Sequence, residues 1–268
     1  MISKKLAGVL SAAAMTFAAG SAFAGGDAVV GNSGCSAAAL GLNPANGSVY
    51  AQLKGALVSA VAAEGEGLDM QMWATIVDRD GVVCAVAFSG ADRGAQWPGS
   101  RVISAQKANT ANAFSLNGLA LSTANLYSAV QPGGSLYGLQ HSNPVDTEVA
   151  YRGNPMHYGQ ANDPMVGRRI GGVNVFGGGL GLYKGKVIKG AVGVSGDTSC
   201  ADHNIGWRVR ANLGLDQLAG VSGVSGDGTR PDNIVFDIDP MTDKSAEGFG
   251  HPACIFLGSN HTSLPVVK

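Results

Sequence analysis

The 268-residue sequence is short of charge and has no run of basic residues. Only 14% of the residues are charged, and 18 Lys and Arg against 19 Asp and Glu leave a net charge of −1. Arg168-Arg169 is too small a basic island to follow a phosphate backbone. We therefore expect no nucleic-acid partner. After residue 24 no stretch approaches the ~20 apolar residues that span a bilayer, so we also expect no membrane span.

Three familiar catalytic or nucleotide-binding signatures are incomplete. Residues 193–196 (Gly-Val-Ser-Gly) are followed by Asp197 where a nucleophile elbow requires glycine. Residues 177–181 lack the third glycine of the dinucleotide fingerprint, and no helix is expected after them. Residues 185–187 lack the Ser or Thr of a phosphate-binding loop. In all three segments the glycines indicate turns.

The N-terminus carries the three parts of an export signal. Lys4 and Lys5 form a positive start, residues 6–23 are apolar and rich in alanine, and Ala22 and Ala24 supply the small residues of a cleavage site. A transmembrane anchor is the alternative, but glycine, serine and threonine interrupt this short segment. We expect residues 1–24 to be a signal peptide that is cleaved near Ala24, which places the protein in the periplasm or outside the cell.

The four cysteines all lie after the predicted cleavage site, at Cys35, Cys84, Cys200 and Cys254. An even number of cysteines in an oxidising compartment favours two disulfides, for which three pairings exist. We favour Cys200–Cys254 because both residues border glycine-rich turns late in the chain. No cysteine lies in a CxxC pair, which argues against a structural zinc site.

Local patterns predict helices and hairpins in alternation. Apolar residues recur every four positions from Val49 to Val61, the stripe of a helix that starts at Ser48. Residues 70–88 form a hairpin around the turn at residues 78–81. The other expected elements are helices at 100–114, 123–130 and 201–213, a hairpin at 180–195, and two added edge strands at 234–238 and 253–257.

This order of elements predicts one α+β domain, with an antiparallel sheet and helices packed on one side. The domain occupies residues 48–216, after an irregular lead-in at 25–47. Residues 131–168 contain four prolines and no sustained periodicity, so we interpret them as an inserted loop, which at this length is functional or mobile. Residues 217–268 form a C-terminal extension.

One helix carries a histidine and a tryptophan away from its expected core stripe. Ile205, Val209 and Leu213 form the stripe, whereas His203 and Trp207 fall together on the opposite side. A tryptophan there must cover a subunit partner, the inserted loop or a flat apolar ligand. The alternative is a helix that is buried on two sides.

Two further histidines lie in the insertion. His141 and His157 share residues 131–168 with three tyrosines and two methionines. Aromatic, His and Met side chains on a loop are the residue types that can ligate or enclose a haem. Each histidine alone is more typical of a surface or turn position.

Four ordered segments resemble a known family. They are residues 75–81 (Thr-Ile-Val-Asp-Arg-Asp-Gly), 104–111 (Ser-Ala-Gln-Lys-Ala-Asn-Thr-Ala), 171–175 (Gly-Gly-Val-Asn-Val), and 190–196 (Gly-Ala-Val-Gly-Val-Ser-Gly) with Asp202 downstream. Together they resemble the GlcG/HbpS-like haem-binding (haem-degrading) domain family. The resemblance implies a PAS/profilin-like α+β domain, homo-oligomers and haem binding, in some members with haem breakdown or redox sensing. Lys107, Thr110 and Asp202 match its motif positions, whereas the insertion, the extension and the cysteines depart from it.

On this resemblance we expect an exported protein that binds haem and stores, relays or senses it. Its candidate axial ligands are His203, His141 and His157, with His203 and His141 as the iron-binding pair. Trp207, Lys107, Thr110 and Asp202 are the other candidate haem-binding residues.

Two other functions stay open at the level of sequence. The first is an enzyme or enzyme accessory in a periplasmic catabolic pathway, acting on a small organic molecule through Lys107, Asp202 and His203. The second is a purely structural oligomeric scaffold.

Overall fold

The computed structural model describes residues 34–268, so the predicted signal peptide and its cleavage site near Ala24 lie outside the described residues. Four strands form one antiparallel sheet in the order β2-β1-β4-β3. The strands are β1 (Trp73–Asp78), β2 (Val83–Phe88), β3 (Gly179–Lys184) and β4 (Val187–Ser195). Both predicted hairpins are therefore confirmed, and so is the single α+β domain.

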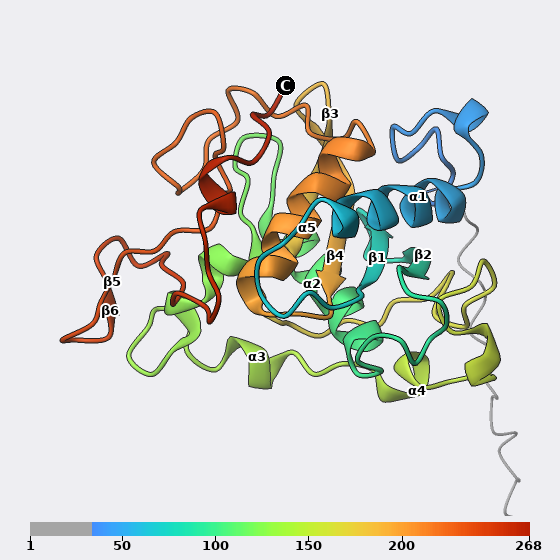
Figure 1. Cartoon of the computed structure of the whole chain (residues 1–268), viewed down its shortest axis with the longest axis horizontal. Coiled ribbons are helices and arrows are strands. Elements are labelled where there is room, and N and C mark those ends of the chain that lie inside the picture. Colours follow the sequence, from blue (N-terminus) through green and yellow to red (C-terminus); the bar gives the residue numbers. More distant parts are fainter. Residues whose placement is uncertain (1–33) are drawn as a thin grey trace, which may run out of the picture.

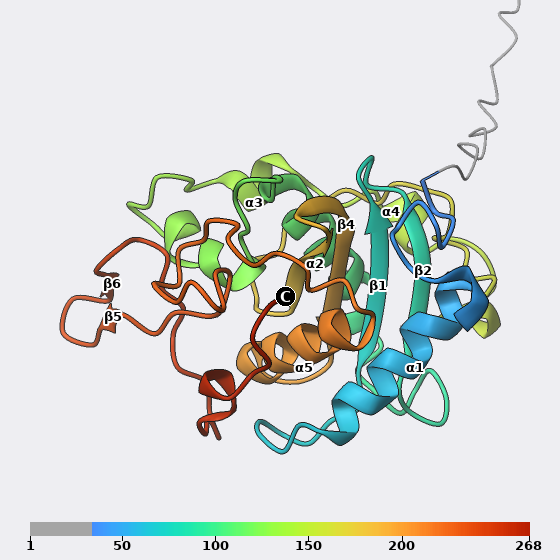
Figure 2. The same cartoon turned by 90° about the horizontal axis from the view of Figure 1, so that it is seen from above.

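Helices cover both faces of this sheet. Helix α2 (Ser100–Phe114) packs on one face, and α1 (Val49–Ala62) and α5 (Ser199–Asn212) lie side by side on the other (Figures 1 and 2). The expectation of helices on one side was wrong because both faces of β1 are apolar. Ala74 and Ile76 join the core beneath α1 and α5, whereas Trp73 and Val77 join the core beneath α2.

Small residues and caps explain where the helices sit. Glycine at position 193 lets α2 approach β4 closely, because a Cβ there would collide with the carbonyl oxygen of Ser104. Ser48 caps α1, and the Thr198 side chain accepts a hydrogen bond from Ala201 N at the start of α5. This cap starts α5 two residues before the predicted position.

The connection between α2 and β3 contains only short helical turns. The predicted helix at 123–130 is two 3₁₀ helices, η2 (Thr123–Leu126) and η3 (Ser128–Val130). The insertion that follows holds α3 (Leu139–Ser142), α4 (Thr147–Ala150) and η4 (Pro155–His157), and Figure 1 shows it in green to yellow along the lower edge. Its end bonds to Val83 of β2, so the insertion protects an edge of the sheet.

The C-terminal extension forms an irregular layer beside α5 rather than additional strands of the main sheet (Figure 1). Its strands β5 (Ile238–Asp239) and β6 (Lys244–Ser245) pair only with each other, and η5 (Asn260–Thr262) follows. The predicted edge strands at 234–238 and 253–257 were wrong. Phe256 has φ 53°, a left-handed conformation that a strand cannot contain.

Two disulfides attach the chain ends to the domain. Cys200–Cys254 ties the extension to the first turn of α5 and confirms the favoured pairing. Cys35–Cys84 ties the lead-in, with its 3₁₀ helix η1 (Pro44–Asn46), to β2. In residues 34–268 the structure contains no helix with the length and apolar character that a membrane crossing requires.

Candidate functional site

Lys107 of α2 and Asp202 of α5 form a buried ion pair at the end of strand β4. Lys107 Nζ lies 2.6 Å from Asp202 Oδ2 and donates a second hydrogen bond to Val194 O at 3.0 Å. The other carboxylate oxygen, Oδ1, accepts hydrogen bonds from the amides of Gly196 and Asp197. Two residues that the resemblance singled out therefore meet, and together they fix the turn between β4 and α5.

Burial shifts the pKa of both partners toward the neutral forms. Desolvation raises the pKa of Asp202 to about 6, while the adjacent Lys107 ammonium opposes that rise. Desolvation likewise lowers the pKa of Lys107, opposed by the carboxylate. Each charge thus offsets the desolvation of the other, and loss of either partner would leave a buried charge.

Thr110 lies on the same helix but makes local contacts. Its Oγ1 donates to Gln106 O at 2.8 Å and accepts from Asn174 N at 3.0 Å. These bonds dock the segment before β3 onto α2. The role of Thr110 that these contacts support is packing.

A cavity of about 260 Å³, the Asp202 pocket, opens above this ion pair. Its walls include Trp97, Ile103 and Phe176, and its polar lining includes Ser199 and Asp202. Ser199 occupies the first position of α5, so a hydroxyl and a helix N-terminus both face this cavity. The pocket offers apolar walls and a polar floor to a small molecule.

His203 and Trp207 are completely enclosed. The C-terminal extension covers the side of α5 that carries them: His203 Nε2 faces Asn233 Oδ1 and Ile234 N, and Trp207 Nε1 donates to Pro265 O. Their exposed fractions are 0% and 1%. The alternative of a helix buried on two sides is the correct one, and the extension is the segment that covers the tryptophan.

The second pocket lies between α2 and the insertion and has a volume of about 380 Å³. We call it the Tyr158 pocket. Apolar and aromatic side chains make most of its wall, with one arginine at an exposed position. Its lining residues are Trp73, Arg93, Gly94, Pro98, Gly99, Arg101, Val102, Tyr151, Pro155 and Tyr158.

A buried arginine organises the Tyr158 pocket. Arg101 forms a bidentate ion pair with Asp163 of the insertion and donates to Ala150 O at 2.7 Å. Its guanidinium lies 3.6 Å from the centre of the Tyr158 ring, a stacked cation–π geometry. Neither Arg101 nor Asp163 was among the residues predicted from the sequence. Arg101 could have been noticed, because it is an arginine in a helix that is otherwise rich in small residues.

The three candidate histidines do not come together. His203 is buried on α5, whereas His141 and His157 are exposed on the insertion. None of the three belongs to the groups of clustered metal-ligand atoms in residues 34–268. His157 differs from His141 in position, since it lies between Pro155 and Tyr158, which both line the Tyr158 pocket. Its Nδ1 is 2.8 Å from the Asn162 amide.

Comparison with known proteins gives the family. Residues 49–211 match the family model described as "Haem degrading protein HbpS-like", which is more than half of the chain. This chain belongs to the HbpS-like family. The match spans the sheet, α1, α2 and α5, and the sequence resemblance is thereby confirmed.

Solved structures similar to this HbpS-like chain are distant. They include a PduOC–haem complex (24% identity, TM-score 0.42, covering 60% of this chain and 88% of that one) and protein ORFY of Klebsiella pneumoniae (27%, 0.42, 62% and 88%). A double mutant of HbpS from Streptomyces reticuli also matches (15%, 0.38, 60% and 82%). None of the curated proteins matches the chain.

Proposed function

We propose that this protein binds haem in the Tyr158 pocket and handles it outside the cytoplasm, as a store, a relay or a sensor. The observation that carries the proposal is the pocket itself, whose size and aromatic lining lie within the range of small-molecule sites. Membership of the HbpS-like family and the haem bound to the PduOC relative support the choice of ligand.

The residues of this pocket fit haem in three respects. Tyr151 and Tyr158 present apolar surface to a flat macrocycle, and the nearly buried Trp73 completes the same wall. Arg93 is exposed at the wall, where its guanidinium can pair with a propionate carboxylate. His157 is an exposed imidazole that lies in sequence between the lining residues Pro155 and Tyr158, and Asn162 can orient that ring through Nδ1. Haem, when bound, supplies an iron centre for ligand exchange or electron transfer.

Among the three candidate axial ligands we therefore choose His157. His203 has no exposed surface, and its Nε2 is already engaged by Asn233 and Ile234. Neither His141 nor His157 is among the residues that line the pocket, but His157 lies between Pro155 and Tyr158, which both line it, whereas His141 is exposed on α3 with no such neighbours. Lys107 and Asp202 hold the fold near the other pocket, and Thr110 docks the segment before β3. Export by residues 1–24 and assembly into a homo-oligomer stay predictions of this proposal, as does the division into domains.

Haemin titration of the purified protein tests the proposal. We expect a Soret shift that saturates near one haem per chain, and a His157→Ala variant with a weaker affinity and a changed Soret position. Separate His141→Ala and His203→Ala variants serve as matched comparisons, and we expect His141→Ala to titrate like the wild type.

Two results would contradict the proposal. Absence of a Soret shift in the wild type would remove haem as the ligand. A normal spectrum in His157→Ala with a changed one in His141→Ala or His203→Ala would move the site away from the Tyr158 pocket. Light scattering on the same samples measures the oligomeric state.

A further inference from the structure

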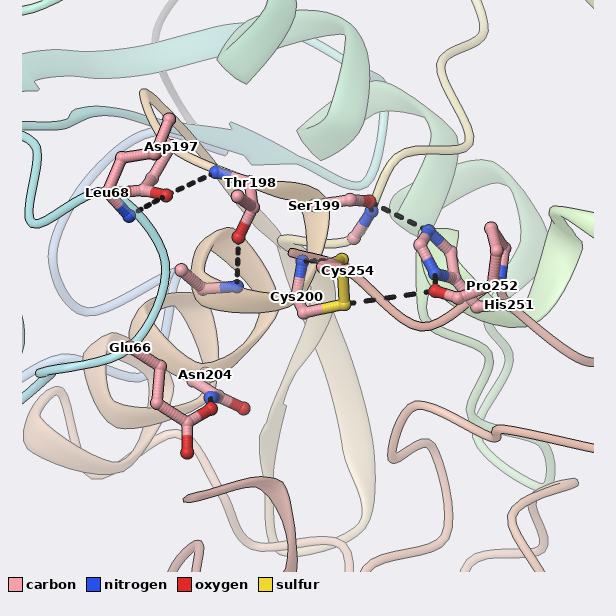
Figure 3. The surroundings of a disulfide bond; sticks show 12 residues. Glu66, Leu68, Asp197, Thr198, Ser199, Cys200, Asn204, His251, Pro252 and Cys254 are labelled. Atoms are coloured by element: carbon pink, nitrogen blue, oxygen red, sulfur yellow. Dashed lines mark hydrogen bonds between the residues drawn. A yellow bond between two sulfur atoms is a disulfide. The ribbon is translucent and has the colours of Figure 1, made fainter. Parts of the chain in front are cut away.

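Ser199 and His251 face each other at the Asp202 pocket, outside the proposed haem site. Ser199 Oγ lies 2.8 Å from His251 Nε2, and His251 Nδ1 lies 2.7 Å from Pro252 O (Figure 3). A carbonyl oxygen can only accept, so Nδ1 carries the proton and donates a hydrogen bond to Pro252 O. This fixes the tautomer in which Nε2 has a free lone pair, and the Ser199 hydroxyl donates to it.

The two side chains come from segments 52 residues apart, and several contacts fix their relative positions. Ser199 is the first residue of α5, and its Oγ also accepts a hydrogen bond from Gly177 N at 2.6 Å. His251 lies on the C-terminal extension, three positions before Cys254, whose disulfide to Cys200 anchors that segment beside Ser199 (Figure 3). His251 is only 3% exposed, so the base is positioned and shielded from water.

The surroundings supply the other parts of an acyl-transfer site. Ser199 lines the Asp202 pocket, a cavity with room for a small acyl group next to this residue. The Ser199 N–H belongs to the first turn of α5, where no helical carbonyl accepts it, and the positive end of the helix dipole lies there. That amide is placed as an oxyanion donor for a group bonded to its own Oγ.

We propose that Ser199 and His251 form a serine–histidine acyl-transfer dyad, oriented by the Pro252 carbonyl, that acts on small esters bound in the Asp202 pocket. The Ser199 oxygen attacks the acyl carbon, and His251 Nε2 takes the hydroxyl proton. The C–O bond to the alcohol breaks, and the alcohol leaves with that proton. Water then attacks the acyl-enzyme, His251 accepts its proton and returns it to Ser199, and a carboxylic acid is released.

The acyl group is small because the pocket, at about 260 Å³, is below the usual range for drug-sized ligands. Trp97, Ile103 and Phe176 line it, so a short aliphatic or aromatic acyl chain fits better than a charged one. The Lys107 ammonium nearby is already paired with the Asp202 carboxylate, so it is not free to bind the negative charge of an acidic substrate. The dyad requires no haem and is independent of the proposed function.

A fluorophosphonate probe tests the dyad on the full exported chain with both disulfides formed. We expect one phosphonyl adduct, mapped by peptide mass spectrometry to Ser199, and hydrolysis of p-nitrophenyl acetate that Ser199→Ala abolishes. His251→Ala lowers both rates by 100-fold or more, the usual contribution of a general base. His261→Ala is the matched control, because it lies on the same extension away from the pocket, and both rates stay at the wild-type value.

The pH profile separates catalysis from a structural role. Desolvation, with a smaller contribution from the charge of Lys107, lowers the pKa of His251 to about 4, although the hydrogen bond to Pro252 O opposes this shift. Ser199, the Tyr127 ring and the sulfur atoms of the Cys200–Cys254 disulfide also lie against the imidazole, and His203 is a titratable group that interacts with it electrostatically. The rate therefore falls only as the pH drops toward about 4. Absence of a Ser199 adduct in the wild type, an undiminished adduct in His251→Ala, or a midpoint near 6.5 overturns the proposal.

Discussion

Removal of the buried ammonium in a Lys107→Met variant should destabilise the protein by an amount that depends on pH. Lys107 and Asp202 are 0% and 3% exposed at their side chains, so the substitution leaves a carboxylate buried without its counter-charge. Breaking such a pair costs about 3–5 kcal/mol. The amides of Gly196 and Asp197 still bond to Asp202, so we expect the lower end, about 3 kcal/mol at pH 8.

The loss should shrink in acid because Asp202 can become neutral. Burial already raises the pKa of Asp202 to about 6, and loss of the ammonium raises it further. A carboxyl with a raised pKa binds its proton more readily in the folded state, so stability increases as the pH falls below that pKa. The gain is at most about 1.4 kcal/mol per pH unit. We therefore expect a loss of about 1–2 kcal/mol at pH 5.

Urea unfolding of wild type and variant at pH 5 and pH 8 measures both quantities. Lys184→Met is the matched control, because that side chain is exposed, and it should stay within about 0.5 kcal/mol of the wild type. A double variant, Lys107→Met with Asp202→Asn, should recover part of the loss because no buried charge remains. A loss below about 1 kcal/mol at pH 8, or the same loss at both pH values, would refute the reasoning.

Two further predictions concern the disulfides and a buried histidine. Replacing Cys200 and Cys254 by serine should lower the free energy of unfolding by about 4 kcal/mol, which is the loop entropy for a separation of 54 residues. The Cys35–Cys84 pair is the control, because its separation of 49 residues gives nearly the same loop entropy. Thermal unfolding compares the two serine variants, and equal losses of stability would show that Cys200–Cys254 has no additional native role at the extension. Burial lowers the pKa of His203 to about 4, so the unfolded chain binds this proton first and stability should fall between about pH 6.5 and 4, by up to about 3 kcal/mol. His203→Gln should flatten that part of the stability–pH curve in urea titrations, and an unchanged slope would contradict the assignment.

Local elements could be predicted from the sequence because their signals are local. The four-residue apolar spacing of α1, the turn at residues 78–81 and the small residues of α2 depend on neighbours within one or two turns. The same holds for the hairpin of β3 and β4. The edge strands at 234–238 and 253–257 failed because β-prone composition does not reveal a left-handed Phe256 or a disulfide at Cys254.

Some candidate residues could also be chosen from the sequence, but not their roles. Lys107 and Asp202 were singled out by motif position, and the structure shows that they pair across 95 residues of chain. His203 and Trp207 were correctly placed on one side of a helix. What covers them could not be predicted, because the extension has no periodicity that indicates where it packs.

The sequence by itself determined the α+β class of this chain, favoured two disulfides from its four cysteines, and carried the family motifs in their order along the domain. Only the tertiary structure decided which groups meet: Arg101 with Asp163 at the Tyr158 pocket, and Ser199 with His251 at the Asp202 pocket. These partners are 62 and 52 residues apart and lie partly in segments without regular structure. Their meeting depends on how loops pack against the sheet and helices, and no local pattern encodes that packing.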